Sequence, residues 1–258
     1  MILRAVRNAL AAIVATVLLA ACTAPASNGP TEPPFTIPSG EPTNEASGSP
    51  GASATPNPAL AEWSFVNRDG ADVSIDDVGT ITVALKSRLL WFRASKGFLM
   101  YHEAKGDFRV TAHVVTTATS DPGQDPGGDG SVQLGGLMIR NPANPPENYV
   151  HVVVGDDGDG LSVETKTTKD NVSEFAGPAW GDNEADLRIC RVGPKISLYK
   201  RLTSDDPWAT ATTYERADLP ETLQAGIDVY TNDEPDITVT VFDFTIEPVA
   251  AEAGCTTD

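Results

Sequence analysis

The sequence is poor in positive charge. Its 258 residues include 18 Lys and Arg against 36 Asp and Glu, which gives a formal net charge of −18. Nucleic-acid binding needs clustered Lys and Arg to neutralise phosphates, and adhesion to anionic lipid headgroups needs the same clusters. The composition therefore argues against both kinds of partner and predicts an acidic, well-solvated exterior.

Several catalytic motifs are also missing. The sequence contains no His-Glu-x-x-His metalloprotease spacing, no Gly-x-Ser-x-Gly elbow and no phosphate-binding loop. Its only histidines are His102, His113 and His151, which lie too far apart in the sequence to indicate a metal site.

Long apolar runs are scarce, and the clearest one lies at the N-terminus. Arg4 and Arg7 are followed by "NALAAIVATVLLAAC", which is shorter than the roughly 20 residues that cross a bilayer. This pattern predicts a cleaved export signal over residues 1–21. Leu19 to Cys22 resemble the bacterial lipobox, which implies that Cys22 is acylated and anchors an extracytoplasmic protein by lipid alone. A plain secretory signal with a chance cysteine is the alternative.

Residues 22–60 have the composition of a tether. This segment holds nine of the 20 prolines and no Lys or Arg. It cannot bury enough apolar surface to offset the entropy of ordering, so we expect a lipidated Cys22 followed by a disordered spacer. A flexible spacer of this length spans on the order of 35 Å and would hold a domain away from the membrane.

Cysteine is rare, with three residues in the chain. If Cys22 carries lipid, Cys190 and Cys255 are left in an oxidising compartment without Cys-x-x-Cys spacing. We predict that they form a disulfide that ties the tail, residues 251–258, to a strand. In the chain-entropy model a loop of this length contributes about 4 kcal/mol. Two unrelated free thiols are the alternative.

Residues 61–250 show alternation of period two and little sustained helical periodicity. "GDFRVTAHVVT" and "GLSVETKT" alternate apolar and polar side chains, and "ADLRICRVGPKISLYKR" predicts a hairpin that turns at Gly193 and Pro194. The period slips near Phe242, which predicts a β-bulge. Many short strands separated by Gly, Asp and Pro predict one all-β domain, a two-sheet antiparallel sandwich or jelly roll.

The order of these segments carries a resemblance. "LLWFRAS", "FLMYHEAKGDFRVTAHV", "GGLMIR", "NYVHVVV", "LRICRVGPKISLYKR", "AGIDVY" and "VFDFTI" follow one another over nearly all of residues 61–248. In this order they resemble the concanavalin A-like lectin/glucanase superfamily. They are most similar to small bacterial domains of unknown function and to the C-terminal sandwich domain of β-xylosidases. The resemblance implies two curved sheets, one of them concave, with carbohydrate as the usual ligand.

A set of polar and aromatic residues alternates with the apolar core positions. Guanidinium and carboxylate groups can hold sugar hydroxyls, and aromatic rings can stack on a pyranose. We therefore predict a shared ligand-binding face. The alternative is a solvated face whose cross-strand ion pairs contribute little. The residues of this predicted face are Arg109, His113, Arg140, Tyr149, His151, Glu164, Lys166, Asp228 and Tyr230.

Loops supply further candidates. Trp63 and Trp91 precede strong strands and are expected in the core, whereas Trp180 and Trp208 lie in polar, loop-like segments that could line a sugar site or cap the sandwich. Clustered carboxylates could bind a structural calcium ion, although Asp and Gly also favour tight turns without any ion. The calcium candidates are Asp121, Asp125, Asp129, Asp156, Asp157 and Asp159.

These observations favour a monomeric, non-catalytic module that binds a polysaccharide or glycoconjugate outside the cell. A structural or protein-interaction domain of the envelope is the first alternative. Glycoside hydrolysis is the second, with Glu164 and Asp228 as acid and base across one face. The glucanase motif Glu-x-Asp-x-x-Glu begins at Glu184 and at Glu234, but neither stretch has the final glutamate.

Overall fold

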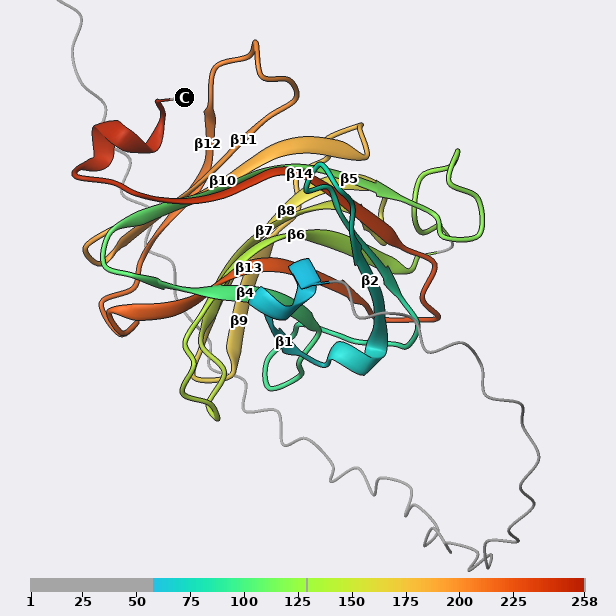
Figure 1. The fold of residues 1–258 in the computed structure, drawn as a ribbon, viewed down its shortest axis with the longest axis horizontal. Helices are drawn as coiled ribbons and strands as arrows, with labels where there is room; N and C mark the ends of the chain where they lie inside the picture. Colours follow the sequence, from blue (N-terminus) through green and yellow to red (C-terminus); the bar gives the residue numbers. More distant parts are fainter. Residues whose placement is uncertain (1–57, 129, 258) are drawn as a thin grey trace, which may run out of the picture. The chain divides into compact units, whose positions relative to one another are not determined.

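The computed structural model describes residues 58–128 and 130–257. In this part of the chain fourteen strands form two antiparallel sheets of seven strands each, which pack face to face (Figure 1). The predicted two-sheet sandwich is thus confirmed. The expected signal peptide, the lipidated Cys22 and nearly all of the expected tether lie outside the described residues.

Sheet A contains the strands that carry most of the predicted ligand face. Successive strands β6, β7, β8 and β9 are neighbours in the sheet, and β13 joins β4 to β6. In spatial order the strands are β1 (Ser64–Val66), β4 (Phe98–Lys105), β13 (Thr222–Thr231), β6 (Val132–Arg140), β7 (Tyr149–Asp157), β8 (Leu161–Lys169) and β9 (Val172–Ala176).

Sheet B combines strands from distant parts of the sequence. The central strand β5 pairs with β10 on one side and with β14 on the other. In spatial order the strands are β12 (Ala209–Glu215), β11 (Lys195–Arg201), β10 (Glu184–Val192), β5 (Phe108–Thr117), β14 (Thr238–Pro248), β3 (Ile81–Leu85) and β2 (Ala71–Ile75). Three short 3₁₀ helices accompany the strands: η1 (Pro58–Glu62), η2 (Arg68–Gly70) and η3 (Glu252–Cys255).

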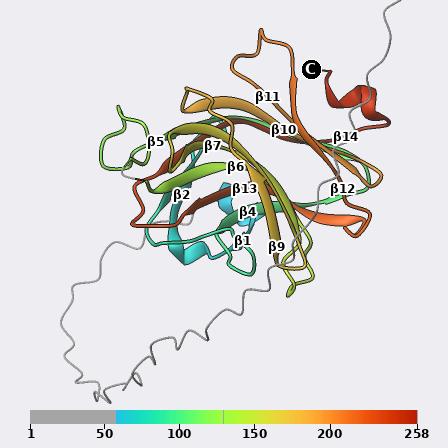
Figure 2. The same cartoon turned by 180° about the vertical axis from the view of Figure 1, so that it is seen from behind.

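The core lies between the sheets, because alternate apolar side chains of each sheet point towards the other. Val110 and Val114 of β5, Val152 of β7 and Ile227 of β13 are fully buried in this cluster. The turn at Gly193 and the irregularity after Phe242, where the register of β14 and β5 shifts, confirm two local predictions. Figure 2 shows the sandwich from behind, with the edge strands β9 and β12 on the same side.

The predicted disulfide is present. Cys190 of β10 and Cys255 of η3 are bonded, with their Cα atoms 5.6 Å apart. Arg188 also donates a hydrogen bond to the carbonyl oxygen of Cys255, so the tail is held on the outer face of sheet B. Among the described residues, none of the helices has the length and apolar character to cross a bilayer.

Candidate functional site

The outer face of sheet A, which points away from the core, is covered by the chain itself. Residues 89–97, between β3 and β4, form this covering segment. Its Trp91 is completely buried and packs edge-to-face on Tyr149, with ring centroids 5.4 Å apart. Trp91 is therefore buried as expected, but it packs in a second apolar cluster on the outer face and not in the core between the sheets.

Hydrogen bonds hold the covering segment in place at several points. The Trp91 indole donates to the carbonyl oxygen of Phe98 at 3.0 Å, and the Asn67 side chain donates to the carbonyl oxygens of Lys96 and Gly97. A β-carbon on Gly97 would lie 2.3 Å from the Trp91 ring, so only glycine fits there. The segment is thus a fixed part of the fold.

Beneath the covering segment, five of the predicted residues meet in one buried polar cluster. His151 contacts Asp228 through Nδ1 at 2.9 Å and Glu164 through Nε2 at 3.3 Å. Lys166 lies 2.7 Å from the same oxygen of Glu164, and Tyr230 donates to that oxygen at 2.6 Å. The cluster forms because β13, β6, β7 and β8 are neighbours, and their register brings alternate residues together.

Basic and acidic groups alternate in this cluster. The ring of His151 lies between the carboxylates of Asp228 and Glu164, and Lys166 lies on the other side of Glu164. Burial by itself would raise the pKa of Glu164, but His151 and Lys166 outweigh burial and lower the pKa from 4.5 to about 2.

Arg140 is also unavailable to a ligand. Its guanidinium makes a two-pronged ion pair with Glu147, at 2.8 and 2.9 Å, and donates to Gln224 at 2.7 Å. It also lies beneath the Trp91 ring, 5.6 Å from the centroid. The prediction that Arg140, Tyr149, His151 and Asp228 line an open groove is therefore wrong, because Trp91 and its neighbours fill the space above them.

Two further members of the predicted face lie elsewhere. Arg109 and His113 belong to β5 and point away from the core on sheet B, so they share no face with the other seven residues. Arg109 pairs with Glu247, and His113 contacts Asp186 at 2.9 Å. Period-two alternation identifies which residues point outward from a strand, but it does not identify the sheet to which the strand belongs.

One part of the outer face of sheet A is open beside the covering segment. A pocket of about 250 Å³ reaches Glu164, Lys166 and Tyr230 of the cluster. Phe92 and Phe175 form apolar walls, with their rings at 82° and centroids 6.3 Å apart. The remaining lining residues are Leu90, Val132, Asp157 and Asn232. We call this hollow the face pocket.

The carboxylate of Glu164 lies at the face pocket. Its contacts with His151, Lys166 and Tyr230 all use Oε1, and no described residue donates a hydrogen bond to Oε2. Since the low pKa of Glu164 keeps this carboxylate ionised, it can accept a hydrogen bond from a hydroxyl group that enters the pocket.

The loop candidates have structural contacts. Trp180 donates to the carbonyl oxygen of Glu184 and lies under Lys200, while Trp208 lies between Arg188 and Arg201 at 4.1 and 4.2 Å. Neither tryptophan lines the face pocket.

The calcium candidates mostly cap turns. Asp121 accepts from Gly123, Asp156 accepts from Gly128 and Gly158, and Asp157 accepts from Asp159. Within residues 58–128 and 130–257, no three His, Cys, Asp or Glu side chains gather as a metal site. Asp129 lies outside the described residues, and calcium binding stays a prediction.

Sequence reasoning missed the walls of the face pocket. Phe175 lies on a five-residue edge strand, which is too short for a clear alternation, and Phe92 belongs to a loop whose apolar residues resembled ordinary core. The register that places Phe175 is known only from the structure. Phe175 pairs with Lys166, so it continues the outward row of the neighbouring strand.

Comparison with known proteins identifies the fold. No protein-family model matches the sequence, and no curated protein matches it. Among solved structures, the chain is similar to a functionally unknown protein from Saccharomyces cerevisiae, with a TM-score of 0.60 and 12% identity over 74% of this chain and 99% of that one.

The chain is also similar to parts of two longer proteins. One is the GH43 protein BlXynB from Bacillus licheniformis, with a TM-score of 0.54 and 13% identity over 73% of this chain and 37% of that one. The other is a xylan β-1,4-xylosidase from Bacillus halodurans, with a TM-score of 0.51 and 11% identity over 68% and 34%. The match spans about a third of each of these two proteins. At such identities the likeness shows the fold alone, which is a concanavalin A-like sandwich.

Proposed function

We propose that this domain binds a glycan without hydrolysing it, and that the face pocket receives one sugar unit. The observation that carries the proposal is the ionised carboxylate of Glu164 at the face pocket, whose contacts with protein groups all use Oε1. Hydrogen bonds to an ionised acceptor are among the stronger ones, and a sugar hydroxyl supplies the donor.

The walls of the pocket suit the same ligand. Phe92 and Phe175 offer ring surface to the apolar face of a pyranose, and Asn232 and Asp157 offer polar groups near the rim. A few placed polar groups in a mainly apolar hollow are typical of small-ligand sites. The fold supports this proposal, because two structurally similar proteins are a GH43 protein and a xylan β-1,4-xylosidase.

The electrostatics favour binding over hydrolysis. A general acid in a glycosidase needs a raised pKa, so that it carries a proton at neutral pH. The pKa of Glu164 is instead lowered to about 2. Its predicted partner Asp228 has no exposed surface, so a substrate cannot reach it.

Binding measurements with sugars test this proposal. We expect the wild-type domain to bind immobilised neutral polysaccharides and their monosaccharides. Phe92→Ala should weaken this binding at least about tenfold, which is equivalent to 1.4 kcal/mol. Glu164→Gln keeps the side-chain size and tests the acceptor, once thermal unfolding shows that the variant is folded. Phe242→Ala, a half-exposed aromatic on sheet B, is the matched control and should bind like the wild type.

Two outcomes would contradict the proposal. Wild-type protein that binds no sugar from a broad panel would favour the structural or protein-interaction alternative. Release of reducing sugar by the wild type, lost in Glu164→Gln, would show an enzyme and overturn the non-catalytic assignment.

We also propose that the domain is displayed outside the cell by a lipid on Cys22. The lipobox-like residues Leu19 to Cys22 motivate this, and the disulfide Cys190–Cys255 fits an oxidising compartment. The full chain, expressed in a bacterium that processes lipoproteins, should partition into the detergent phase of Triton X-114. Cys22→Ala should move it to the aqueous phase. Equal partitioning of both proteins would contradict the anchor.

A further inference from the structure

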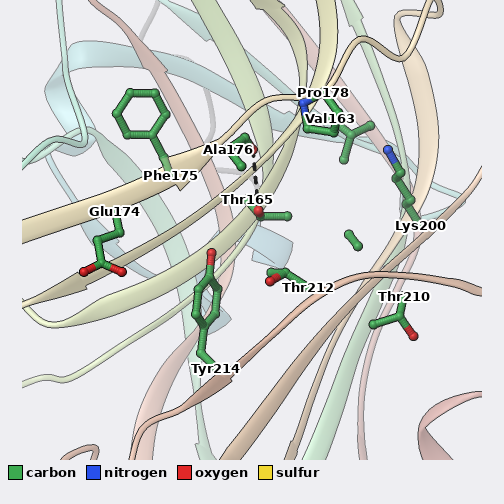
Figure 3. A pocket seen from close by; sticks show the side chains of 11 residues that line it. Val163, Thr165, Glu174, Phe175, Ala176, Pro178, Lys200, Thr210, Thr212 and Tyr214 are labelled. Atoms are coloured by element: carbon green, nitrogen blue, oxygen red, sulfur yellow. Dashed lines mark hydrogen bonds between the residues drawn. The ribbon is translucent and has the colours of Figure 1, made fainter. Parts of the chain in front are cut away.

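A second and larger hollow lies at the edge of the sandwich, where β9 of sheet A faces β11 and β12 of sheet B (Figure 3). It has a volume of about 500 Å³, and an adjoining hollow of about 440 Å³ continues it along the same strands. Both are lined by Glu174 and Tyr214, so they form one groove. We call it the edge groove.

The edge groove is lined by hydroxyl groups. Thr165, Thr167, Thr210, Thr212 and Tyr214 all contribute to its walls. Figure 3 shows the Tyr214 hydroxyl pointing towards Thr165. Burial raises the pKa of Tyr214, so its hydroxyl stays protonated and can both donate and accept. A row of such groups matches a ligand that carries many hydroxyls.

Two oppositely charged side chains on opposite walls have no ion pair with any described residue. Glu174 on β9 and Lys200 on β11 both line the groove, and no described residue makes an ion pair or hydrogen bond with either side chain. The ammonium group of Lys200 lies over the ring of Trp180, 4.4 Å from the ring centroid. One acceptor and one donor are thus available to a ligand, on different sides of the groove.

Two exposed apolar side chains also border the edge groove. Val172 is 65% exposed and Phe175 is 59% exposed, and both border the groove from the short strand β9. Exposed apolar side chains that gather beside polar groups mark a binding surface more often than scattered ones do. Phe175 lines both hollows, and its ring lies on the outer face of sheet A beside Phe92 and Lys166, so β9 stands between the face pocket and the edge groove.

We propose that the edge groove binds the extended backbone of a neutral polysaccharide, while the face pocket on the other side of β9 receives a single sugar unit. The proposal rests on the glycan binding proposed above and extends it from one sugar to a chain. The groove is elongated and hydroxyl-lined, which fits a linear polyol chain. The net charge of −18 disfavours an anionic polysaccharide, because like charges repel at long range.

An added peptide strand fits this edge less well. Strand addition needs a regular, accessible edge, whereas β9 has five residues and β12 pairs with β11 through a register shift between Leu198 and Tyr199. Short and irregular edges are poor templates for strand pairing. A carbohydrate chain needs no such backbone register.

Binding as a function of chain length tests the proposal. The probes are a monosaccharide and linear oligosaccharides of increasing length from xylan, mannan and a mixed β-glucan, with polygalacturonic acid as the anionic probe. We expect the affinity of the wild type for neutral chains to rise about tenfold or more with length and then level off, which corresponds to 1.4 kcal/mol or more. Polygalacturonic acid should bind more weakly.

Groove variants separate the two sites. Tyr214→Phe combined with Glu174→Gln should remove the gain from chain length and leave monosaccharide binding unchanged. Lys200→Met is an independent groove variant with the same expectation, and Glu103→Gln on β4 is the exposed control. Phe92→Ala should weaken short and long ligands alike.

The outcomes distinguish failure of the groove from failure of the proposed function. If groove variants bind long chains like the wild type while Phe92→Ala weakens every ligand, the groove proposal is wrong and the face pocket stands. If no neutral sugar of any length binds, both proposals are wrong. Capture of an unfolded polypeptide that groove variants abolish, without any sugar binding, would identify a peptide groove and would also overturn the proposal.

Discussion

The outer faces of the two sheets carry similar residues in different surroundings. On sheet A, His151 contacts Asp228 and Glu164 with no exposed surface. On sheet B, His113 contacts Asp186 and Glu184 in a half-exposed hollow. Both histidines occupy outward positions of alternating strands. The difference arises because residues 89–97 cover one face, and only a short tail reaches the other. A charged residue at an outward position is therefore not necessarily a surface residue.

Removing Trp91, the tryptophan of the covering segment, should lower the free energy of unfolding at least as much as the other substitutions below. Trp91→Ala leaves a cavity over Tyr149 and Arg140, and we expect a loss of about 4 kcal/mol in the free energy of unfolding. Urea denaturation measures it. The matched variant Trp208→Ala, on the half-exposed face of sheet B, should cost less. Equal losses would show that the covering segment contributes little.

Removing the disulfide should affect the other face. The bond closes a loop between positions 65 residues apart and holds the tail on sheet B, so Cys190→Ala with Cys255→Ala should lower the free energy of unfolding by about 4 kcal/mol. Reduction of the wild type with dithiothreitol under denaturing conditions should reproduce the loss. An unchanged denaturation midpoint in the double variant would contradict the prediction.

A smaller effect is expected where the covering segment approaches itself. Gly97→Ala places a methyl group 2.3 Å from the Trp91 ring, and overpacking of this kind costs about 2 kcal/mol. Gly123→Ala is the control, since its new methyl group would meet only an ordinary contact, and we expect a change within about 0.5 kcal/mol. Thermal unfolding compares the two. A neutral Gly97→Ala would mean that the segment moves aside freely.

The smallest expected effect is a pH dependence of the stability, which originates at His113 on sheet B. The hydrogen bond to Asp186 raises the pKa of His113 above 6.5, so folding favours the protonated form. The resulting stabilisation is fully present below pH 6.5 and is lost as the pH rises through the raised pKa of the folded state. The melting temperature of the wild type should therefore fall over this interval, and His113→Asn should flatten the fall. A parallel fall in both proteins would contradict the assignment.

The sequence was sufficient for those features that depend on neighbours along the chain. The alternation in β5, β6, β7 and β8 located core residues such as Val110 and Val152, and a count of cysteines paired Cys190 with Cys255. It could not place Arg109 apart from Arg140, because the partners of β5 come from residues far along the chain. It also could not show that Trp91 covers Tyr149, since a loop leaves no periodic trace of where it packs.

The pairing of β5 constrains when the protein can fold. Thr117 pairs with Thr238, and Phe108 pairs with Pro248, so the middle of sheet B requires the last strand of the chain. A ribosome releases β5 long before β14, so the middle of sheet B stays incomplete until β14 has been synthesised. Pairing between segments that are far apart in the sequence slows folding in general, and we therefore expect sheet B to complete late.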